Sequence, residues 1–145
     1  MRICAWNCRG LGSNVNDPTV SFLVNIVRLY QLEFLFLFET KTTVEKSTRR
    51  LHILEFPNSM GVDAEGFAGG IWLSSKNNVD LTVTYYCKNY MWCNLNTVHI
   101  LSNISWDACF VYREPTISNC SNIWESIQGL YDHFKVPTLL IGDFN

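Results

Sequence analysis

The fold is decided by the segment Glu33-Phe34-Leu35-Phe36-Leu37-Phe38, which runs directly into Glu39-Thr40-Lys41. A continuous apolar run of this length is typical of a central strand covered on both faces. A buried strand holds the side chains at its ends rigidly, without relying on a mobile loop. The segment therefore predicts a core strand whose carboxyl end delivers the carboxylate of Glu39 to a fixed place.

Strand and helix patterns alternate on either side of this segment. Asp17-Pro18 predicts a helix start, with Asp at the cap and Pro at the first helical position, and apolar residues recur at helical spacing through about Gln31. Glycines mark loops on both sides of the core strand. The full set expected up to residue 74 is a strand at Arg2–Asn7, a helix at Asp17–Gln31, a helix at Thr43–Leu54, loops at Gly61, Gly66, Gly69 and Gly70, and a strand at Ile71–Ser74.

The second half of the chain predicts three strands, a helix and a last strand. Residues 79–86, 90–100 and 106–112 indicate an antiparallel meander, and residues 119–134 carry apolar side chains on one helical face. Residues 137–141 have the pattern of a buried strand, which ends in Gly142-Asp143-Phe144-Asn145. The order of elements predicts a mixed α+β layered fold, and the lack of a linker or repeat favours one domain over residues 1–145.

Composition restricts the class of protein. The 145 residues are 48% hydrophobic, which is enough for a real core, and the sequence has neither a long apolar run nor a signal peptide. We therefore expect a soluble, intracellular protein. The six cysteines include no C-x-x-C pair and indicate buried free thiols. The formal net charge of −2 weakens a reading in which nucleic acid is gripped mainly through phosphate contacts.

Polar side chains follow three of the apolar strand-like segments. Asn7 follows the first, Glu39 the second, and Asp143 with Asn145 the last. Several such strand ends side by side gather carboxylates and amides into one site. Hard oxygen ligands select Mg²⁺ or Mn²⁺, and such a metal suits the hydrolysis of a phosphate ester, with Glu39 as the best candidate ligand.

Five motifs in order resemble those of the endonuclease/exonuclease/phosphatase superfamily, and most of all the endonuclease domain of plant LINE-type, non-LTR retrotransposons. They are Trp6-Asn7-Cys8-Arg9-Gly10-Leu11-Gly12, Phe38-Glu39-Thr40-Lys41, Gly69-Gly70-Ile71-Trp72, Tyr112-Arg113-Glu114-Pro115 and Ile141-Gly142-Asp143-Phe144-Asn145. The resemblance implies two β-sheets packed face to face with flanking helices. It also implies a DNA-nicking, Mg²⁺- or Mn²⁺-dependent hydrolase, with DNA as substrate, no membrane, no obligate protein partner and action in the nucleus.

The resemblance also implies a role for each site residue. Glu39 would bind the metal, and Asn7 would help to hold the metal site. Tyr112 would contact the scissile phosphate, Asp143 would orient or activate the attacking water, and Asn145 would hydrogen-bond the phosphate. These roles suit an in-line attack, which needs a positioned water, a metal and donors for the phosphoryl oxygens.

The sequence departs from the family pattern in three places. Arg9 stands where abasic-site endonucleases have an acidic residue, which favours the retrotransposon branch, and Arg113 stands where a small residue is usual. The family's later Ser-Asp-His motif would lie beyond Asn145, so we expect a fold that is incomplete at the C-terminus. Two alternatives therefore stay open: a catalytically dead, truncated remnant, and a superfamily phosphatase acting on a small molecule or lipid.

Overall fold

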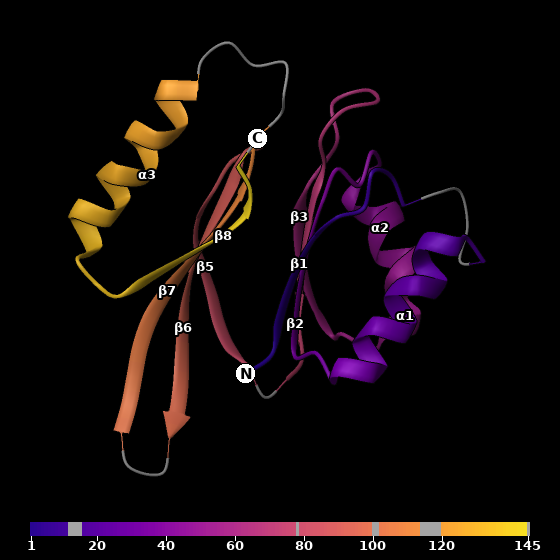
Figure 1. Cartoon of the computed structure of the whole chain (residues 1–145), viewed down its shortest axis with the longest axis horizontal. Coiled ribbons are helices and arrows are strands. Elements are labelled where there is room, and N and C mark those ends of the chain that lie inside the picture. The colour runs from indigo at the N-terminus through magenta and orange to yellow at the C-terminus, as the bar shows by residue number, and fades with distance from the viewer. Residues whose placement is uncertain (12–15, 78, 100–101, 114–119, 145) are drawn as a thin grey trace. The chain divides into compact units, whose positions relative to one another are not determined.

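The computed structural model describes residues 1–11, 16–77, 79–99, 102–113 and 120–144 of the chain. The chain divides into two compact units, Met1–Val79 and Asp80–Asn145. Each unit contains one four-stranded sheet (Figure 1); among the described residues the first unit also has two α-helices and a short 3-10 helix, and the second has one α-helix. The single domain expected over residues 1–145 stays a prediction.

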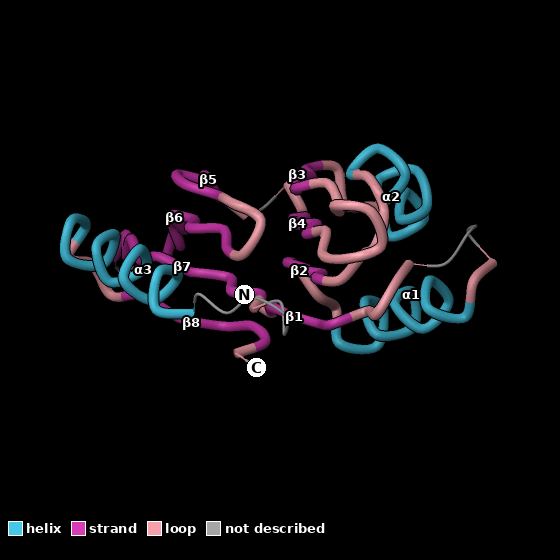
Figure 2. Tube along the Cα trace, turned by 90° about the horizontal axis from the view of Figure 1, so that it is seen from above, coloured by secondary structure: helices cyan, strands magenta, loops and turns pink. Residues whose placement is uncertain are grey.

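The first unit is a mixed sheet with its two α-helices on one face. Its strand order is β1-β2-β4-β3, in which β1 pairs parallel with β2 and the other neighbours are antiparallel. Both helices lie on the same side of the sheet (Figure 2). The elements are β1 (Ile3–Asn7), α1 (Pro18–Tyr30), β2 (Phe34–Phe38), α2 (Val44–Leu51), the short 3-10 helix η1 (His52–Leu54), β3 (Asn58–Val62) and β4 (Ile71–Ser75).

Helix α1 begins and packs as the sequence predicts. The side chain of Asp17 caps it by accepting a hydrogen bond from the backbone N–H of Thr19 at 2.9 Å, and Pro18 follows at the first helical position. Its buried residues join the alternate residues Leu35 and Leu37 of β2 in one apolar cluster. Every residue of β2 is at most 4% exposed, so the predicted core strand is confirmed.

Strand β3 corrects the expectation that Gly61 marks a loop. Residues 58–62 pair antiparallel with β4, and Gly61 lies opposite Trp72. A Cβ at Gly61 would come within 2.3 Å of the carbonyl oxygen of Ile71. Glycine therefore serves here to allow a close approach of two strands, a use that a single sequence does not distinguish from a turn.

The second unit is the predicted meander, extended by one parallel strand. Its order is β5-β6-β7-β8, with antiparallel pairing from β5 to β7 and parallel pairing of β7 with β8. Apolar residues of α3 pack on β6 and β7, where Ile127 joins a cluster with Trp92 and Cys109. The elements are β5 (Asp80–Tyr86), β6 (Tyr90–His99), β7 (Ser102–Tyr112), α3 (Cys120–Phe134) and β8 (Thr138–Asp143).

Strand β8 forms as expected, but it is not buried. Leu139 is 42% exposed and Leu140 is 44% exposed, although neighbouring residues of a strand point to opposite faces. In the described sheet β8 is the last strand in the order and pairs with β7 alone. An apolar run signals hydrophobic side chains, whereas the position of a strand in its sheet depends on distant pairing.

The predicted α+β fold class, two β-sheets with flanking helices, is confirmed. The thiols of Cys8, Cys93 and Cys109 are buried and free, as the sequence predicts, and those of Cys4 and Cys87 are free and half-buried. Within the described residues, no helix is both long enough and apolar enough to cross a membrane.

Candidate functional site

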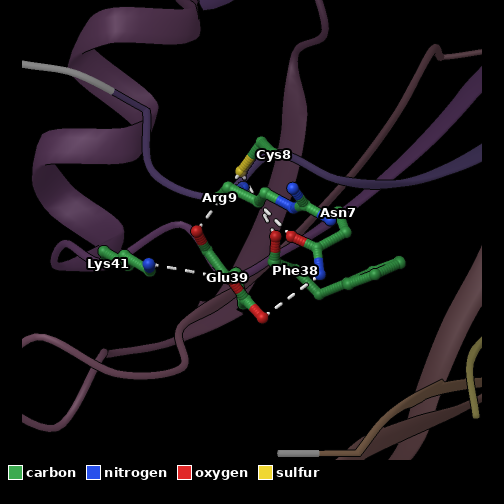
Figure 3. A network of polar contacts seen from close by, with 6 residues as sticks. All are labelled: Asn7, Cys8, Arg9, Phe38, Glu39 and Lys41. Carbon is green, nitrogen blue, oxygen red and sulfur yellow. Dashed lines mark hydrogen bonds and ion pairs between the residues drawn. The ribbon is translucent and has the colours of Figure 1, made fainter. Parts of the chain in front are cut away.

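The parallel pair β1 and β2 brings Asn7 and Glu39 together. Asn7 is the last residue of β1 and lies opposite Phe38, the last residue of β2, so Glu39 follows at the same end. The side-chain amide of Asn7 donates a hydrogen bond from Nδ2 to Oε1 of Glu39 at 3.2 Å (Figure 3). Only 16% of the Glu39 side-chain surface is exposed. Two residues that lie 32 positions apart in the sequence thus form one polar pair.

The orientation of the Asn7 amide is set by a second hydrogen bond. Its Oδ1 accepts from the backbone N–H of Arg9 at 3.0 Å (Figure 3). A carbonyl oxygen is the end of the amide that accepts from an N–H, so the amino end must face the carboxylate of Glu39. Asn7 therefore donates to Glu39, and its own oxygen accepts from the main chain.

The main chain around Glu39 is held on both sides. On one side, Cys8 and Gly10 donate their backbone N–H groups to the carbonyls of Phe38 and Glu39, at 3.1 and 2.7 Å. On the other side, Thr40 and Lys41 donate theirs to the carbonyls of Gly70 and Gly69, at 3.1 and 3.0 Å. Segment 38–41 is therefore fixed by neighbours from two of the five sequence motifs.

The thiol of Cys8 adds a further donor to this segment. Its Sγ donates to the carbonyl of Phe38 at 3.2 Å. Burial raises the pKa of Cys8 to about 11, so the group remains a protonated thiol near neutral pH. Cys8 is thus a structural donor to the segment, and its protonated state makes it a poor nucleophile.

Left-handed backbone is concentrated at this site. Arg9, Glu39 and Lys41 have φ values of 49°, 54° and 53°. Such values are uncommon for residues other than glycine, and each costs roughly 1–2 kcal/mol. Strain of this kind persists only where the surrounding structure enforces it, and it tends to accumulate at functional sites.

Lys41 also belongs to the site around Glu39, although the sequence analysis did not single it out as a site residue. Its Nζ lies 3.7 Å from Oε2 of Glu39, on the oxygen that does not face Asn7. The sequence did place Lys41 two residues after Glu39 in Phe38-Glu39-Thr40-Lys41. In the structure the two charged side chains meet with both residues in the left-handed backbone conformation, which the sequence does not reveal.

The residues around Glu39 fit a divalent metal such as Mg²⁺. The described residues contain no group of three His, Cys, Asp or Glu side chains placed to hold a metal ion. Mg²⁺ does not require such a cage, because it keeps several waters and is usually bound through one or two carboxylates plus substrate phosphates. Glu39 meets that requirement. Asn7 supports Glu39 through its amide N–H, and its oxygen accepts from the backbone N–H of Arg9.

Strands β7 and β8 bring together a second pair. Tyr112 is opposite Asp143 in the parallel register, and the backbone N–H of Arg113 donates to the carbonyl of Asp143 at 3.1 Å. Tyr112 is 2% exposed, and its backbone N–H donates to the carbonyl of Asn89 at 2.6 Å, while the Asn89 side chain donates to the Tyr112 carbonyl at 3.3 Å. The parallel pairing therefore aligns two of the predicted site residues at one strand end.

Gly142 and Arg113 complete this second cluster. Gly142 has a φ of 152°, and a Cβ there would meet the carbonyl oxygen of Val111 at 1.8 Å, so the close approach of β8 to β7 requires glycine. The Nε of Arg113 is buried, and the described residues offer it no hydrogen-bond acceptor.

The predicted site residues thus form two pairs. Asn7 with Glu39 lies in the first unit, and Tyr112 with Asp143 lies in the second. Asn145 lies outside the described residues. The gathering of all five into a single site stays a prediction.

Comparison with solved structures shows which proteins share this fold. The 3′ phosphatase NExo from Neisseria, solved with a product DNA hairpin, is 15% identical with a TM-score of 0.69, over 100% of this chain and 58% of that one. The catalytic domain of APE2 from Xenopus laevis is 13% identical with a TM-score of 0.64, also over 100% and 58%. An endonuclease/exonuclease/phosphatase family protein from Bacteroides thetaiotaomicron is 11% identical with a TM-score of 0.61, over 99% and 62%.

The chain thus spans less than two thirds of the length of these structures. No family model matches the sequence, and no curated protein matches it. At these identities the likeness concerns the fold, and the chain has the fold of solved proteins that include members of the endonuclease/exonuclease/phosphatase family.

Proposed function

We propose that the chain is a metal-dependent phosphodiesterase that nicks DNA, encoded by a LINE-type retrotransposon-like element of a plant. The observation that carries the proposal is the Asn7–Glu39 pair, a positioned carboxylate at the carboxyl ends of two parallel strands. The fold supports it, because the similar structures include an AP endonuclease from Leishmania major and the DNA-bound Neisseria phosphatase. The retrotransposon and plant assignments rest on the sequence motifs.

Each site residue has a separate proposed role in the hydrolysis. Glu39 would hold Mg²⁺ or Mn²⁺, which when bound neutralises charge on the phosphate. Asn7 donates to the carboxylate of Glu39 through its 3.2 Å hydrogen bond. Asp143 would take the proton of the attacking water, while Tyr112 would donate to a phosphate oxygen. Asn145, which lies outside the described residues, is proposed to donate to another phosphate oxygen.

The charge of the chain bears on how DNA would be bound. With 11 basic and 13 acidic residues, the protein lacks the basic excess of proteins that neutralise many phosphates. The proposal therefore places most of the phosphate recognition at the metal and at the few donors of the site. It also includes action inside the cell, in the nucleus, where such an element would meet its target.

A phosphatase acting on a phosphorylated small molecule or lipid is the second candidate: the net charge of −2 permits it, whereas the motif from Trp6 to Gly12 argues against it. The two candidates differ in the product. A nicking enzyme converts supercoiled plasmid to the relaxed circle, whereas a phosphatase releases inorganic phosphate from a monoester and leaves the plasmid intact.

The test is Mg²⁺-dependent nicking of supercoiled plasmid by the full chain, with Glu39→Gln as the variant and Glu45→Gln as the matched control. Glu45 is a carboxylate of the same unit whose side chain is 81% exposed, where it pairs with Arg49. We expect EDTA and Glu39→Gln each to lower the nicking rate by at least about 100-fold, a loss typical of removing one key electrostatic group. Glu45→Gln should nick at the wild-type rate.

Wild-type activity in the Glu39→Gln variant would overturn the assignment of the metal residue. A folded wild-type chain that binds Mn²⁺ but neither nicks plasmid nor releases phosphate would favour the catalytically dead remnant. Phosphate release without nicking would favour the small-molecule or lipid phosphatase.

A further inference from the structure

Lys41 combines a fixed backbone with an exposed charge. Its backbone N–H donates to the carbonyl of Gly69 at 3.0 Å, and its φ is 53°. The stem of its side chain runs past Gly10, where an added Cβ would lie 3.8 Å from Cδ of Lys41. The side chain is nevertheless 42% exposed. The ammonium group can therefore change partners by rotation of the side chain alone, while the main chain of the site stays in place.

The partner that Lys41 has in this structure is the carboxylate that a metal would need. Its Nζ lies 3.7 Å from Oε2 of Glu39, whereas Oε1 accepts from the neutral amide of Asn7. A half-buried carboxylate needs a positive partner or hydrogen-bond donors. Asn7 can remain when a divalent cation binds Glu39, because an amide carries no charge. The ammonium group of Lys41 would be repelled by the bound metal, because two positive charges would then lie within a few ångströms of each other.

We propose that Lys41 is an exchangeable cation of the site: it neutralises Glu39 when no divalent metal is bound, and it turns to a phosphate oxygen of the substrate when the metal takes its place. This inference rests on the proposed function and names a positioning and phosphate-binding residue for it. Lysine suits the task because its ammonium group is a compact point charge on a flexible stem and binds phosphate without a fixed geometry.

The exchange has two measurable consequences. Removal of the ammonium group removes a competitor for Glu39, so the affinity for a divalent metal should rise. Exposed ion pairs are weak, and their usual strength corresponds to a rise of about two- to fivefold. The same removal deletes one contact to phosphate, so the affinity for DNA in the presence of metal should fall. A residue that only stabilises the local backbone would not change the two affinities in opposite directions.

The experiment measures Mn²⁺ binding to the full chain by electron paramagnetic resonance, and then binding of a fluorescently labelled phosphorothioate DNA duplex at saturating Mn²⁺. The variants are Lys41→Met, Lys41→Arg and Glu39→Gln. Lys46→Met is the matched control, because Lys46 is an exposed lysine of α2 in the same unit. Circular dichroism of each variant checks that the fold is kept.

We expect Lys41→Met to bind Mn²⁺ about two- to fivefold more tightly and the duplex at least about threefold more weakly, with the Mn²⁺ effect shrinking as salt screens the charges. Lys41→Arg should restore both affinities towards wild type, Lys46→Met should change neither, and Glu39→Gln should lose Mn²⁺ binding.

The outcomes separate this inference from the proposed function. Unchanged Mn²⁺ and DNA affinities in Lys41→Met, together with lost Mn²⁺ binding in Glu39→Gln, would overturn the role of Lys41 and leave the proposed function standing. Equal Mn²⁺ binding by wild type and Glu39→Gln, or no binding by either, would overturn both.

Discussion

Gly70 supports the main chain at Glu39, and replacing it with alanine should destabilise the first unit. Gly70 has a φ of 86°, and an added Cβ would lie 2.3 Å from Oγ1 of Thr40 and 3.2 Å from Cβ of Ala64. Thr40 is only 2% exposed, so its side chain has little room to move away. The substitution therefore combines an unfavourable backbone conformation with a steric clash.

The neighbouring glycine provides a control that separates these two costs. Gly69 also has a positive φ, 71°, but an added Cβ there would meet nothing within 4 Å. Gly69→Ala should therefore carry the conformational cost alone, roughly 1–2 kcal/mol. Gly70→Ala should carry a similar cost plus about 1–3 kcal/mol for overpacking. The two variants should thus differ by about 1–3 kcal/mol in the free energy of unfolding, the range of the overpacking term alone.

The assay is equilibrium unfolding in urea, followed by circular dichroism and by tryptophan fluorescence, since Trp72 is buried in the first unit. A lower midpoint at constant slope reports a loss of stability. Equal midpoints for Gly69→Ala and Gly70→Ala would refute the reasoning, because they would show that Thr40 and Ala64 yield to the added methyl group without cost.

Three further predictions concern the second cluster and the thiols. Asp143→Asn should lower the plasmid nicking rate far more than it weakens DNA binding by anisotropy, and equal losses would contradict its role on water. Gly142→Ala, whose Cβ would lie 1.8 Å from a backbone oxygen, should abolish amide-exchange protection in β8, whereas Gly129→Ala, with open space, should not. Burial raises the pKa of Cys8 to about 11 and that of Cys93 to about 12. The free energy of unfolding should therefore stay constant with pH below about 8.5, the usual thiol pKa. Above that pH it should fall as pH rises towards 11–12, by up to about 1.4 kcal/mol per pH unit for each thiol. Urea midpoints that stay constant from pH 8 to 11 would refute the thiol prediction.

The elements predicted from local patterns were found close to where the sequence placed them. Helix α1 begins at its Asp17-Pro18 signal, and β2 is the apolar run that follows it. These signals are local, because a cap satisfies backbone groups two residues away and an apolar run reports its own burial. The antiparallel meander was equally readable, because short connections join neighbouring strands.

The errors concern elements that are defined by distant partners. Strand β3 pairs with β4 where Gly61 allows a close approach to Ile71, and the apolar side chains Leu139 and Leu140 of β8 are exposed in the described structure. Neither fact is encoded in a window of neighbouring residues. Turn glycines and strand glycines look alike in one sequence, and so do the apolar runs of central and outer strands.

For the candidate site, the sequence by itself determined which side chains stand at strand ends: Asn7, Glu39, Tyr112 and Asp143 were all identified from pattern and motif. Only the tertiary structure decided how they are paired. Parallel pairing of β1 with β2 turned the amide of Asn7 towards Glu39, and left-handed backbone at residues 39 and 41 brought Lys41 to the same carboxylate. These contacts depend on the register of strands and on strain enforced by Gly69 and Gly70, which form only when distant segments of the chain pack together.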